Sequence, residues 1–165
     1  MNANSRVHQL AAAIAAAAHD RHKLILVLGN FGAGKTQLLQ TASAATEGAY
    51  LNLNLALTER LRQLSRSRYA DGVAVHTEID LLCDELSQHS RPLFVDNVEM
   101  LFSPELGKVN PVDTFKRISR QRPVVLALPA RHDGSYAEYS TIGRADYLRM
   151  EIDGYIIFNL ENTPA

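Results

Sequence analysis

The stretch KLILVLGNFGAGKTQLL, residues 23–39, decides the fold of this chain. After Lys23 it runs through aliphatic residues without alternation, which is typical of a strand buried on both faces of a parallel sheet. A glycine-rich turn follows over residues 29–36, and inward-facing Leu38 and Leu39 predict a helix over residues 36–46. A strand, a tight turn and a helix in this order form the setting of a phosphate-binding loop.

The turn GNFGAGKT fits the pattern G-x-x-x-x-G-K-[ST] at each fixed position. Glycines let the backbone turn tightly and bring amide N–H groups onto phosphates, and the helix that follows adds its positive end. Lys35 is expected to reach the β- and γ-phosphates, and the Thr36 hydroxyl to bind Mg²⁺. The chain carries no Asn/Thr-Lys-x-Asp motif that reads guanine, which favours ATP over GTP. The predicted nucleotide-binding residues are Gly29, Asn30, Phe31, Gly32, Ala33, Gly34, Lys35, Thr36 and Gln37.

A second acidic element is expected beside the phosphate loop, because a carboxylate that ends a neighbouring strand holds the magnesium ion of such sites. Asp96 ends the apolar segment PLFVD, residues 92–96, and is the predicted partner of Thr36 at the metal; the alternative is an aspartate that caps a turn. The next residue, Asn97, can orient water but cannot accept its proton as a base does. Glu99 can serve if the chain turns it toward the γ-phosphate, and is otherwise a solvated loop residue. The candidate catalytic residues are therefore Asp96, Asn97 and Glu99, and slow or partner-completed hydrolysis is expected.

Two groups of arginines are candidates for contacts with phosphate. The polar segment 130–150 is expected to be irregular, and its arginines are candidate sensors or fingers for the γ-phosphate: Arg131, Arg144 and Arg149. The second group can form a local DNA-contacting patch or simply a solvated helix face and loop: Arg60, Arg62, Arg66 and Arg68.

Length and composition indicate one globular domain over residues 1–165, with 46% hydrophobic and 21% charged residues. A net charge of −1 excludes a global basic field for nucleic acid or membranes. No apolar run approaches the roughly 18 residues of a membrane span. The single cysteine excludes an intramolecular disulfide, and with the expected need for nucleotide it favours a cytoplasmic protein.

Periodicity predicts the remaining elements. An alanine-rich helix occupies the N-terminal 1–20 region, over residues 5–19, and further helices are expected at 58–64, 76–89 and 111–121. Further strands are expected at 49–55, 92–96, 123–128 and 155–160. Strands that alternate with helices imply an α/β fold with a mostly parallel five-stranded sheet covered by helices on both faces.

Two classes of phosphate-loop protein compete. Small-molecule kinases usually keep an acidic substrate-binding element on the second strand, but here that strand reads Leu51-Asn52-Leu53-Asn54-Leu55, with amides and no carboxylate. A carboxylate on the third strand favours the P-loop NTPase core of the additional-strand (AAA+/RecA-like) type. The expected strand order is 5-1-4-3-2, and the chain leaves no room for a helical lid domain.

Four segments, LGNFGAGKTQLL, YLNLNLALTERL, LFVDNVEMLF and RQRPVVLAL, make the chain similar to the BrxF family. These are small P-loop proteins of type III BREX bacteriophage-exclusion systems in bacteria. The resemblance covers roughly residues 23–128. It implies an ATPase role in antiphage defence, with Gly29 to Thr36 and Asp96 as the nucleotide site. It also implies partners encoded beside it: a large AAA+ ATPase, a DNA methyltransferase, a helicase and an alkaline-phosphatase-like protein.

Three functions remain open at this point. The first is a weak or partner-dependent ATPase, in which a second copy of the chain can complete the site. The second is a nucleotide-gated adaptor without useful hydrolysis, whose docking surface lies around residues 99–107 or 130–150. The third is a small-molecule kinase, which the second strand disfavours.

Overall fold

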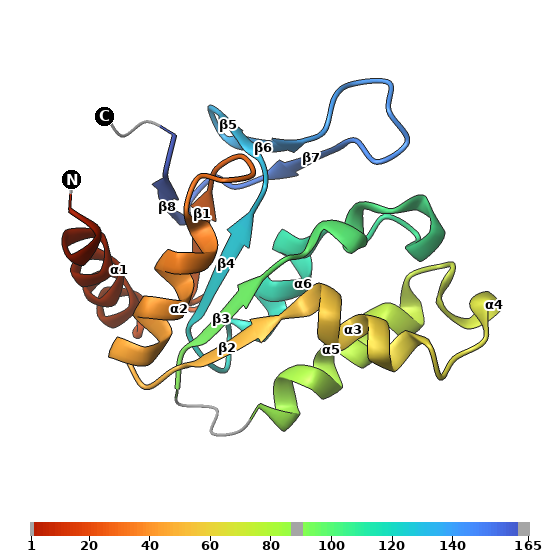
Figure 1. The fold of residues 1–165 in the computed structure, drawn as a ribbon, viewed down its shortest axis with the longest axis horizontal. Helices are drawn as coiled ribbons and strands as arrows, with labels where there is room; N and C mark the ends of the chain where they lie inside the picture. Colours follow the sequence, from red (N-terminus) through yellow and green to blue (C-terminus); the bar gives the residue numbers. More distant parts are fainter. Residues whose placement is uncertain (1, 87–90, 162–165) are drawn as a thin grey trace.

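A five-stranded parallel sheet forms the centre of the computed structural model, which describes residues 2–86 and 91–161 (Figure 1). Its strands are β1 (Leu24–Leu28), β2 (Ala49–Asn52), β3 (Leu93–Asp96), β4 (Val124–Leu128) and β8 (Ile156–Asn159). They lie in the order β2-β3-β4-β1-β8, and each neighbouring pair is parallel. The predicted α/β architecture and the predicted order 5-1-4-3-2 are confirmed.

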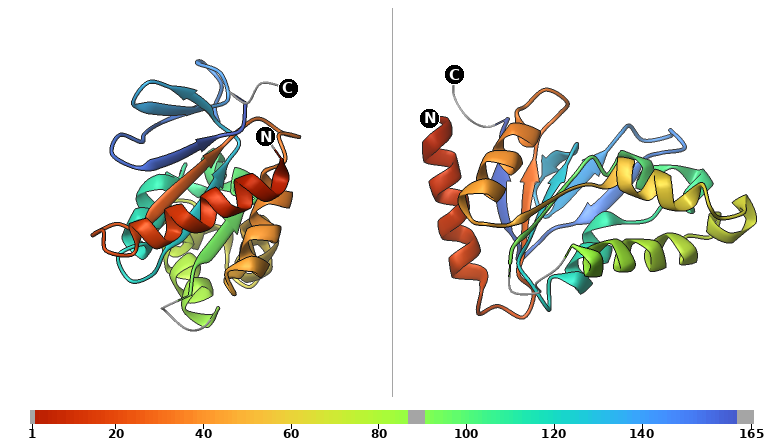
Figure 2. Two further views of the ribbon diagram at one scale, coloured as in Figure 1. Left: turned by 90° about the vertical axis from the view of Figure 1, so that its left-hand side faces the viewer. Right: turned by 60° about the horizontal axis from the view of Figure 1, so that its bottom comes forward.

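Helices cover both faces of this sheet because side chains of a strand point alternately to opposite sides. Ile25 and Val27 of β1 face α1 (Ala3–Ala17) and α2 (Lys35–Ala45). Leu26 faces the other layer, which consists of α3 (Leu53–Leu61), α5 (Val73–Glu85) and α6 (Pro111–Ile118). Figure 2 shows α1 as the outermost layer beside α2. All residues of β1 and β4 are buried, which explains their continuous aliphatic sequences.

The second strand is shorter than predicted. The strand expected over residues 49–55 ends at Asn52, and α3 begins at Leu53. The side chain of Asn52 accepts a hydrogen bond from the Leu55 amide at 3.2 Å and so caps the helix. Leu53, Leu57 and Leu61 then recur every four residues on the buried face. The helix predicted over residues 58–64 corresponds to the second half of this helix, which ends earlier than predicted, at Leu61.

The prediction that residues 130–150 are irregular is wrong. They contain most of a second, antiparallel sheet. Its strands are β5 (Arg131–Asp133), β6 (Tyr136–Tyr139) and β7 (Leu148–Glu151). Ala137 and Met150 lie opposite each other and are buried, so this sheet also has an apolar face. The Tyr139 ring stacks on Phe102 with centroids 3.9 Å apart.

The remaining elements are short or differ only at their ends. The helix predicted over residues 76–89 begins earlier, at Val73, and is described to Glu85; residues 87–89 lie outside the described residues. The helix predicted over residues 111–121 ends at Ile118. Short turns of helix complete the fold: α4 (Arg66–Tyr69), η1 (Glu99–Phe102) and η2 (Pro104–Leu106). Within residues 2–86 and 91–161, no helix has the length and apolar character to cross a membrane.

Candidate functional site

The glycine-rich turn joins the carboxyl end of β1 to the first turn of α2 (Figure 1). Gly34 precedes the helix with a φ of +91°, a left-handed conformation that side chains with a Cβ rarely adopt. Gly29 is constrained by space instead, because a Cβ there would lie 2.9 Å from Cβ of Ala33. No side chain caps α2, so the first amides of the helix remain available to an anion.

Lys35 lies at the bottom of this turn and is only 9% exposed. Its ammonium group donates to the carbonyl oxygens of Gly29 at 2.6 Å and Asn30 at 2.7 Å. An ammonium has three protons, so one donor remains for a phosphate oxygen. Burial lowers the pKa of Lys35, while Asp96, Glu99 and Glu161 act in the opposite direction. Two loop carbonyls thus hold the Lys35 ammonium, and among the described contacts no carboxylate pairs with it directly.

Asp96 gathers three donors at the end of β3. One carboxylate oxygen accepts from the Thr36 hydroxyl at 2.6 Å and from the Tyr50 hydroxyl at 2.9 Å. The other accepts from the backbone amide of Asn97 at 2.9 Å. Burial and the bond to Asp96 raise the pKa of Tyr50 to about 12, so this hydroxyl stays protonated. Thr36 and Asp96, predicted from distant parts of the sequence, are therefore in direct contact.

The Thr36–Asp96 pair fits the requirements of Mg²⁺. The Thr36 hydroxyl donates a hydrogen bond to Asp96, so the lone pairs of its oxygen remain available to a cation. Mg²⁺ is usually bound by one or two protein oxygens together with substrate phosphates and water, rather than by a cage of side chains. The described part of the chain contains no cluster of three or more His, Cys, Asp or Glu side chains that could hold a metal.

Glu99 is held in place by a residue that sequence reasoning did not assign to the site. The side-chain amide of Asn54 donates to the Glu99 carboxylate at 2.9 Å, and its oxygen accepts from the Met100 amide at 3.2 Å. The backbone amide of Asn54 also donates to the Asn97 carbonyl at 2.9 Å. Asn54 thereby ties the start of α3 to the turn after β3. The alternative in which Glu99 is only a solvated loop residue is wrong, because Asn54 holds its carboxylate.

These groups surround one cavity of about 360 Å³. Its lining consists of Phe31, Gly32, Gly34, Lys35, Thr36, Gln37, Gln40, Asp96, Asn97 and Glu99. All three candidate catalytic residues are thus brought together with most of the predicted nucleotide-binding residues. Of the latter, Gly29, Asn30 and Ala33 do not line the cavity; Gly29 and Asn30 contribute by holding Lys35.

Three contributors besides Asn54 were missed: Tyr50, Gln40 and Glu161. Tyr50 and Gln40 flank Asp96 and the cavity from β2 and α2. Glu161, just after β8, accepts from the Asn30 amide at 2.7 Å and so ties the edge strand to the phosphate loop. No local motif marks these residues. The only signal was the series of amides in LNLNL, which includes Asn54.

The candidate arginine fingers do not line this cavity. Arg131 and Arg149 both pair with Glu138, at 2.5 Å and 3.6 Å, within the antiparallel sheet. Arg144 pairs with Asp146 at 3.3 Å. In this structure all three serve ion pairs of the small sheet and its turn.

The basic segment 60–68 is also largely paired. Arg60 contacts Glu78 and Glu85, Arg62 contacts Glu59, and Arg66 contacts Glu105. These contacts lower the net positive charge that a DNA backbone would meet. They favour the solvated-surface interpretation over a DNA-binding patch.

No protein-family model matches the chain, and no curated protein matches it. The solved structure of C. elegans PCH-2 is similar over 99% of this chain, with a TM-score of 0.47 and 15% identity. The matched region is 43% of that protein, so this chain spans less than half of its length.

Proposed function

We propose that this chain is an ATP- and Mg²⁺-binding P-loop protein of the additional-strand type, with weak or partner-dependent ATPase activity. One observation carries the proposal: Lys35, Thr36 and Asp96 meet in one cavity at the start of α2. Lys35 keeps one donor for the phosphates, and Thr36 and Asp96 supply oxygens for Mg²⁺. The position of β4 between β1 and β3 supports the additional-strand class.

Glu99 is the proposed water-positioning group. It lines the same cavity as Lys35, and Asn54 fixes its carboxylate. A carboxylate can take the proton of an attacking water, whereas the amide of Asn97 cannot. The candidate arginine fingers Arg131, Arg144 and Arg149 pair with Glu138 and Asp146, which supports a transition-state charge supplied from another chain.

The cellular setting that we propose is a bacterial BREX antiphage complex in the cytoplasm. It rests on the resemblance of residues 23–128 to the BrxF family. The proposed partners are the large AAA+ ATPase, methyltransferase or phosphatase-like subunit of such systems, and a second copy of the chain is a further candidate.

Phosphate release from Mg²⁺-ATP over a wide range of protein concentration tests the ATPase. We expect turnover per chain to rise with concentration and to vanish in Lys35→Ala. Lys116→Ala is the matched control and should keep the activity. Lys116 belongs to α6, which packs on the opposite face of the sheet from α2. Equal turnover in wild type and Lys35→Ala would contradict the proposal.

A nucleotide-gated adaptor is the second candidate, and a specific chain of contacts favours it. Glu99 begins η1, and Phe102 at the end of η1 stacks on Tyr139 of the antiparallel sheet. A change at the γ-phosphate would therefore reach residues 99–107 and 131–151. Binding of BREX partners that requires ATP and is lost in Lys35→Ala, without phosphate release, would support the adaptor. A small-molecule kinase ranks lower, since no carboxylate of β2 lines the cavity.

A further inference from the structure

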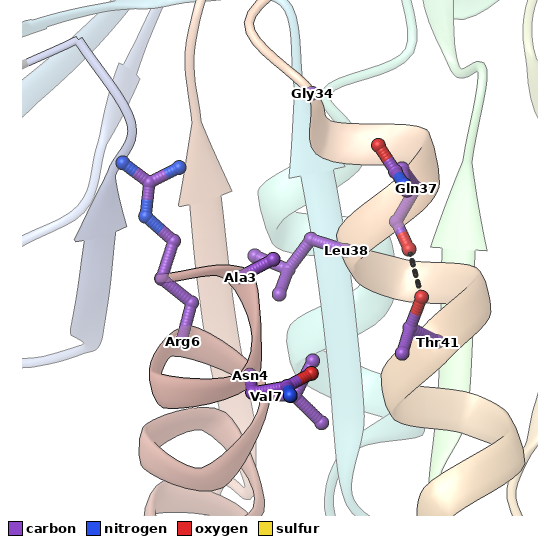
Figure 3. A pocket seen from close by; sticks show the side chains of 8 residues that line it. All are labelled: Ala3, Asn4, Arg6, Val7, Gly34, Gln37, Leu38 and Thr41. Carbon is purple, nitrogen blue, oxygen red and sulfur yellow. Dashed lines mark hydrogen bonds between the residues drawn. The ribbon is translucent and has the colours of Figure 1, made fainter. Parts of the chain in front are cut away.

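A second cavity, of about 240 Å³, lies between α1 and α2 (Figure 3). Four residues of α1, the glycine before α2 and three residues of α2 line it: Ala3, Asn4, Arg6, Val7, Gly34, Gln37, Leu38 and Thr41. Its volume is several times the roughly 30 Å³ that one water molecule occupies in the liquid. Nothing in the proposed chemistry of phosphate binding or hydrolysis uses this space.

The two cavities adjoin each other. Gly34 and Gln37 line both, so the start of α2 separates the phosphate side from the α1 side. The first cavity, of about 360 Å³, already falls in the range of roughly 300–1,000 Å³ that is usual for a small-molecule site, and the second adds about 240 Å³ beside it. A ligand that places an anionic group on the loop and extends past Gly34 would enter the second cavity.

The lining of the second cavity suits a flat, uncharged ring with polar edges. Figure 3 shows the apolar side chains of Ala3, Val7 and Leu38 between the two helices. Asn4 and Gln37 also line the cavity, and the side-chain amide of each supplies both donors and an acceptor. Such a combination of apolar walls and a few polar groups is typical of small-molecule sites.

Arg6 adds a positive charge at the loop end of this cavity. In Figure 3 its guanidinium extends from α1 toward the end of α2 at which Gly34 lies. The side chain is half-buried. A cation in this lining can attract an anionic group of a ligand that occupies the second cavity.

We infer that this second cavity is the subsite for the base and ribose of the bound nucleotide, with α1 as its outer wall. The inference rests on the proposed function, since the phosphates must first occupy the loop. It assigns to α1 a role in recognition: the helix encloses the nucleoside, and Asn4 and Gln37 contact the edge of the base. The nucleoside then contributes affinity that the phosphates alone do not provide.

Titration calorimetry with two probes, Mg²⁺-ATP and Mg²⁺-tripolyphosphate, tests this assignment. Ala3→Phe fills the cavity from α1 and Thr41→Phe from α2. We expect each to weaken ATP binding by about tenfold or more, which is a free-energy difference of about 1.4 kcal/mol, and to leave tripolyphosphate binding unchanged. Retained tripolyphosphate binding shows that the variant is folded. Ala12→Phe, on an exposed position of the same helix, is the matched control and should change neither.

The outcomes separate the two proposals. If both filling variants bind ATP as wild type does, or if wild type binds tripolyphosphate as tightly as ATP, the subsite assignment is overturned while the phosphate site stands. If wild type binds neither probe, or if Lys35→Ala binds tripolyphosphate as wild type does, the proposed function itself fails, and this inference fails with it.

Discussion

Asn97 contributes to the site through its backbone. Its φ of +55° is left-handed, its amide donates to Asp96, and its carbonyl accepts from Asn54. Asparagine tolerates this conformation, glycine adopts it freely, and a β-branched residue is strained there. We expect Asn97→Gly to retain stability and ATP turnover, and Asn97→Val to lose about 1–2 kcal/mol of unfolding free energy, measured by urea denaturation. A large loss of turnover in Asn97→Gly at unchanged ATP affinity would instead give the amide side chain the water-positioning role.

Glu99 makes the complementary prediction. Its carboxylate lines the cavity and is oriented by Asn54, so it is the group that can accept a proton from water. Glu99→Gln should lower phosphate release by roughly 10²–10⁴-fold, the usual contribution of a general base, with ATP affinity little changed. Glu105→Gln, in an exposed ion pair with Arg66, is the matched control and should keep wild-type turnover. Unchanged turnover in Glu99→Gln would exclude Glu99 as the base.

At the residue scale, local sequence patterns were enough to predict Lys35, Thr36 and Asp96. Lys35 and Thr36 belong to a fixed pattern, and Asp96 ends an apolar segment, so their meeting follows from the parallel sheet. Asn54, Tyr50 and Glu161 belong to other elements. Their contacts depend on where α3 begins and on which strand lies beside β1, which no local pattern specifies.

At the element scale, Glu138 of β6 links the three strands of the antiparallel sheet. The side chain is only 8% exposed, and it pairs with Arg131 of β5 and Arg149 of β7, one on each neighbouring strand. Glu138→Ala leaves two arginines without their shared partner and should loosen this sheet. We expect faster hydrogen exchange in residues 131–151, with no change in exchange over α2 and no loss of ATP binding. Loss of ATP binding in this variant would place the small sheet within the nucleotide site.

The two errors at the element scale have physical causes. LNLNL has the period of a strand, but Asn52 caps a helix and the following leucines also satisfy a four-residue period, so the alternation alone was misleading. Residues 130–150 appeared irregular because the strands of the small sheet are only three or four residues long and carry charged side chains. Their apolar face consists of single residues such as Ala137 and Met150, which form no visible run.

At the scale of the molecule, the strand order explains where the site lies. The carboxyl ends of β1 and β3 carry the phosphate loop and Asp96, and β4 lies between them. Ligands of open parallel sheets bind outside the carboxyl ends of the strands. The order was predictable because the carboxylate at the end of the third strand favoured the additional-strand class, in which the fourth strand lies between the first and the third. The contact of Glu161 with the loop was not, since it depends on the edge position of β8.

Stability of the whole molecule should fall at alkaline pH. The pKa of Tyr50 is raised from 10.0 to about 12, by burial and by the bond to Asp96, so the unfolded chain ionises first. The stabilisation is complete below pH 10 and is lost as the pH rises toward 12. We expect the unfolding free energy of Tyr50→Phe to decline less steeply over this range than that of wild type. Burial raises the pKa of Cys83 to about 12 as well, so part of the decline should remain in Tyr50→Phe. Identical slopes for the two proteins would show that Tyr50 is not held protonated by the fold.

The most direct test of the central claim is to measure the equilibrium binding of Mg²⁺-ATP by titration calorimetry. The proteins compared are wild type and Lys35→Ala, with Lys116→Ala as control. We expect saturable binding by wild type and Lys116→Ala, and no measurable binding by Lys35→Ala, because this variant loses the cation that two loop carbonyls hold for the phosphates. Equal affinity of Lys35→Ala and wild type for ATP would contradict a nucleotide site in the phosphate loop.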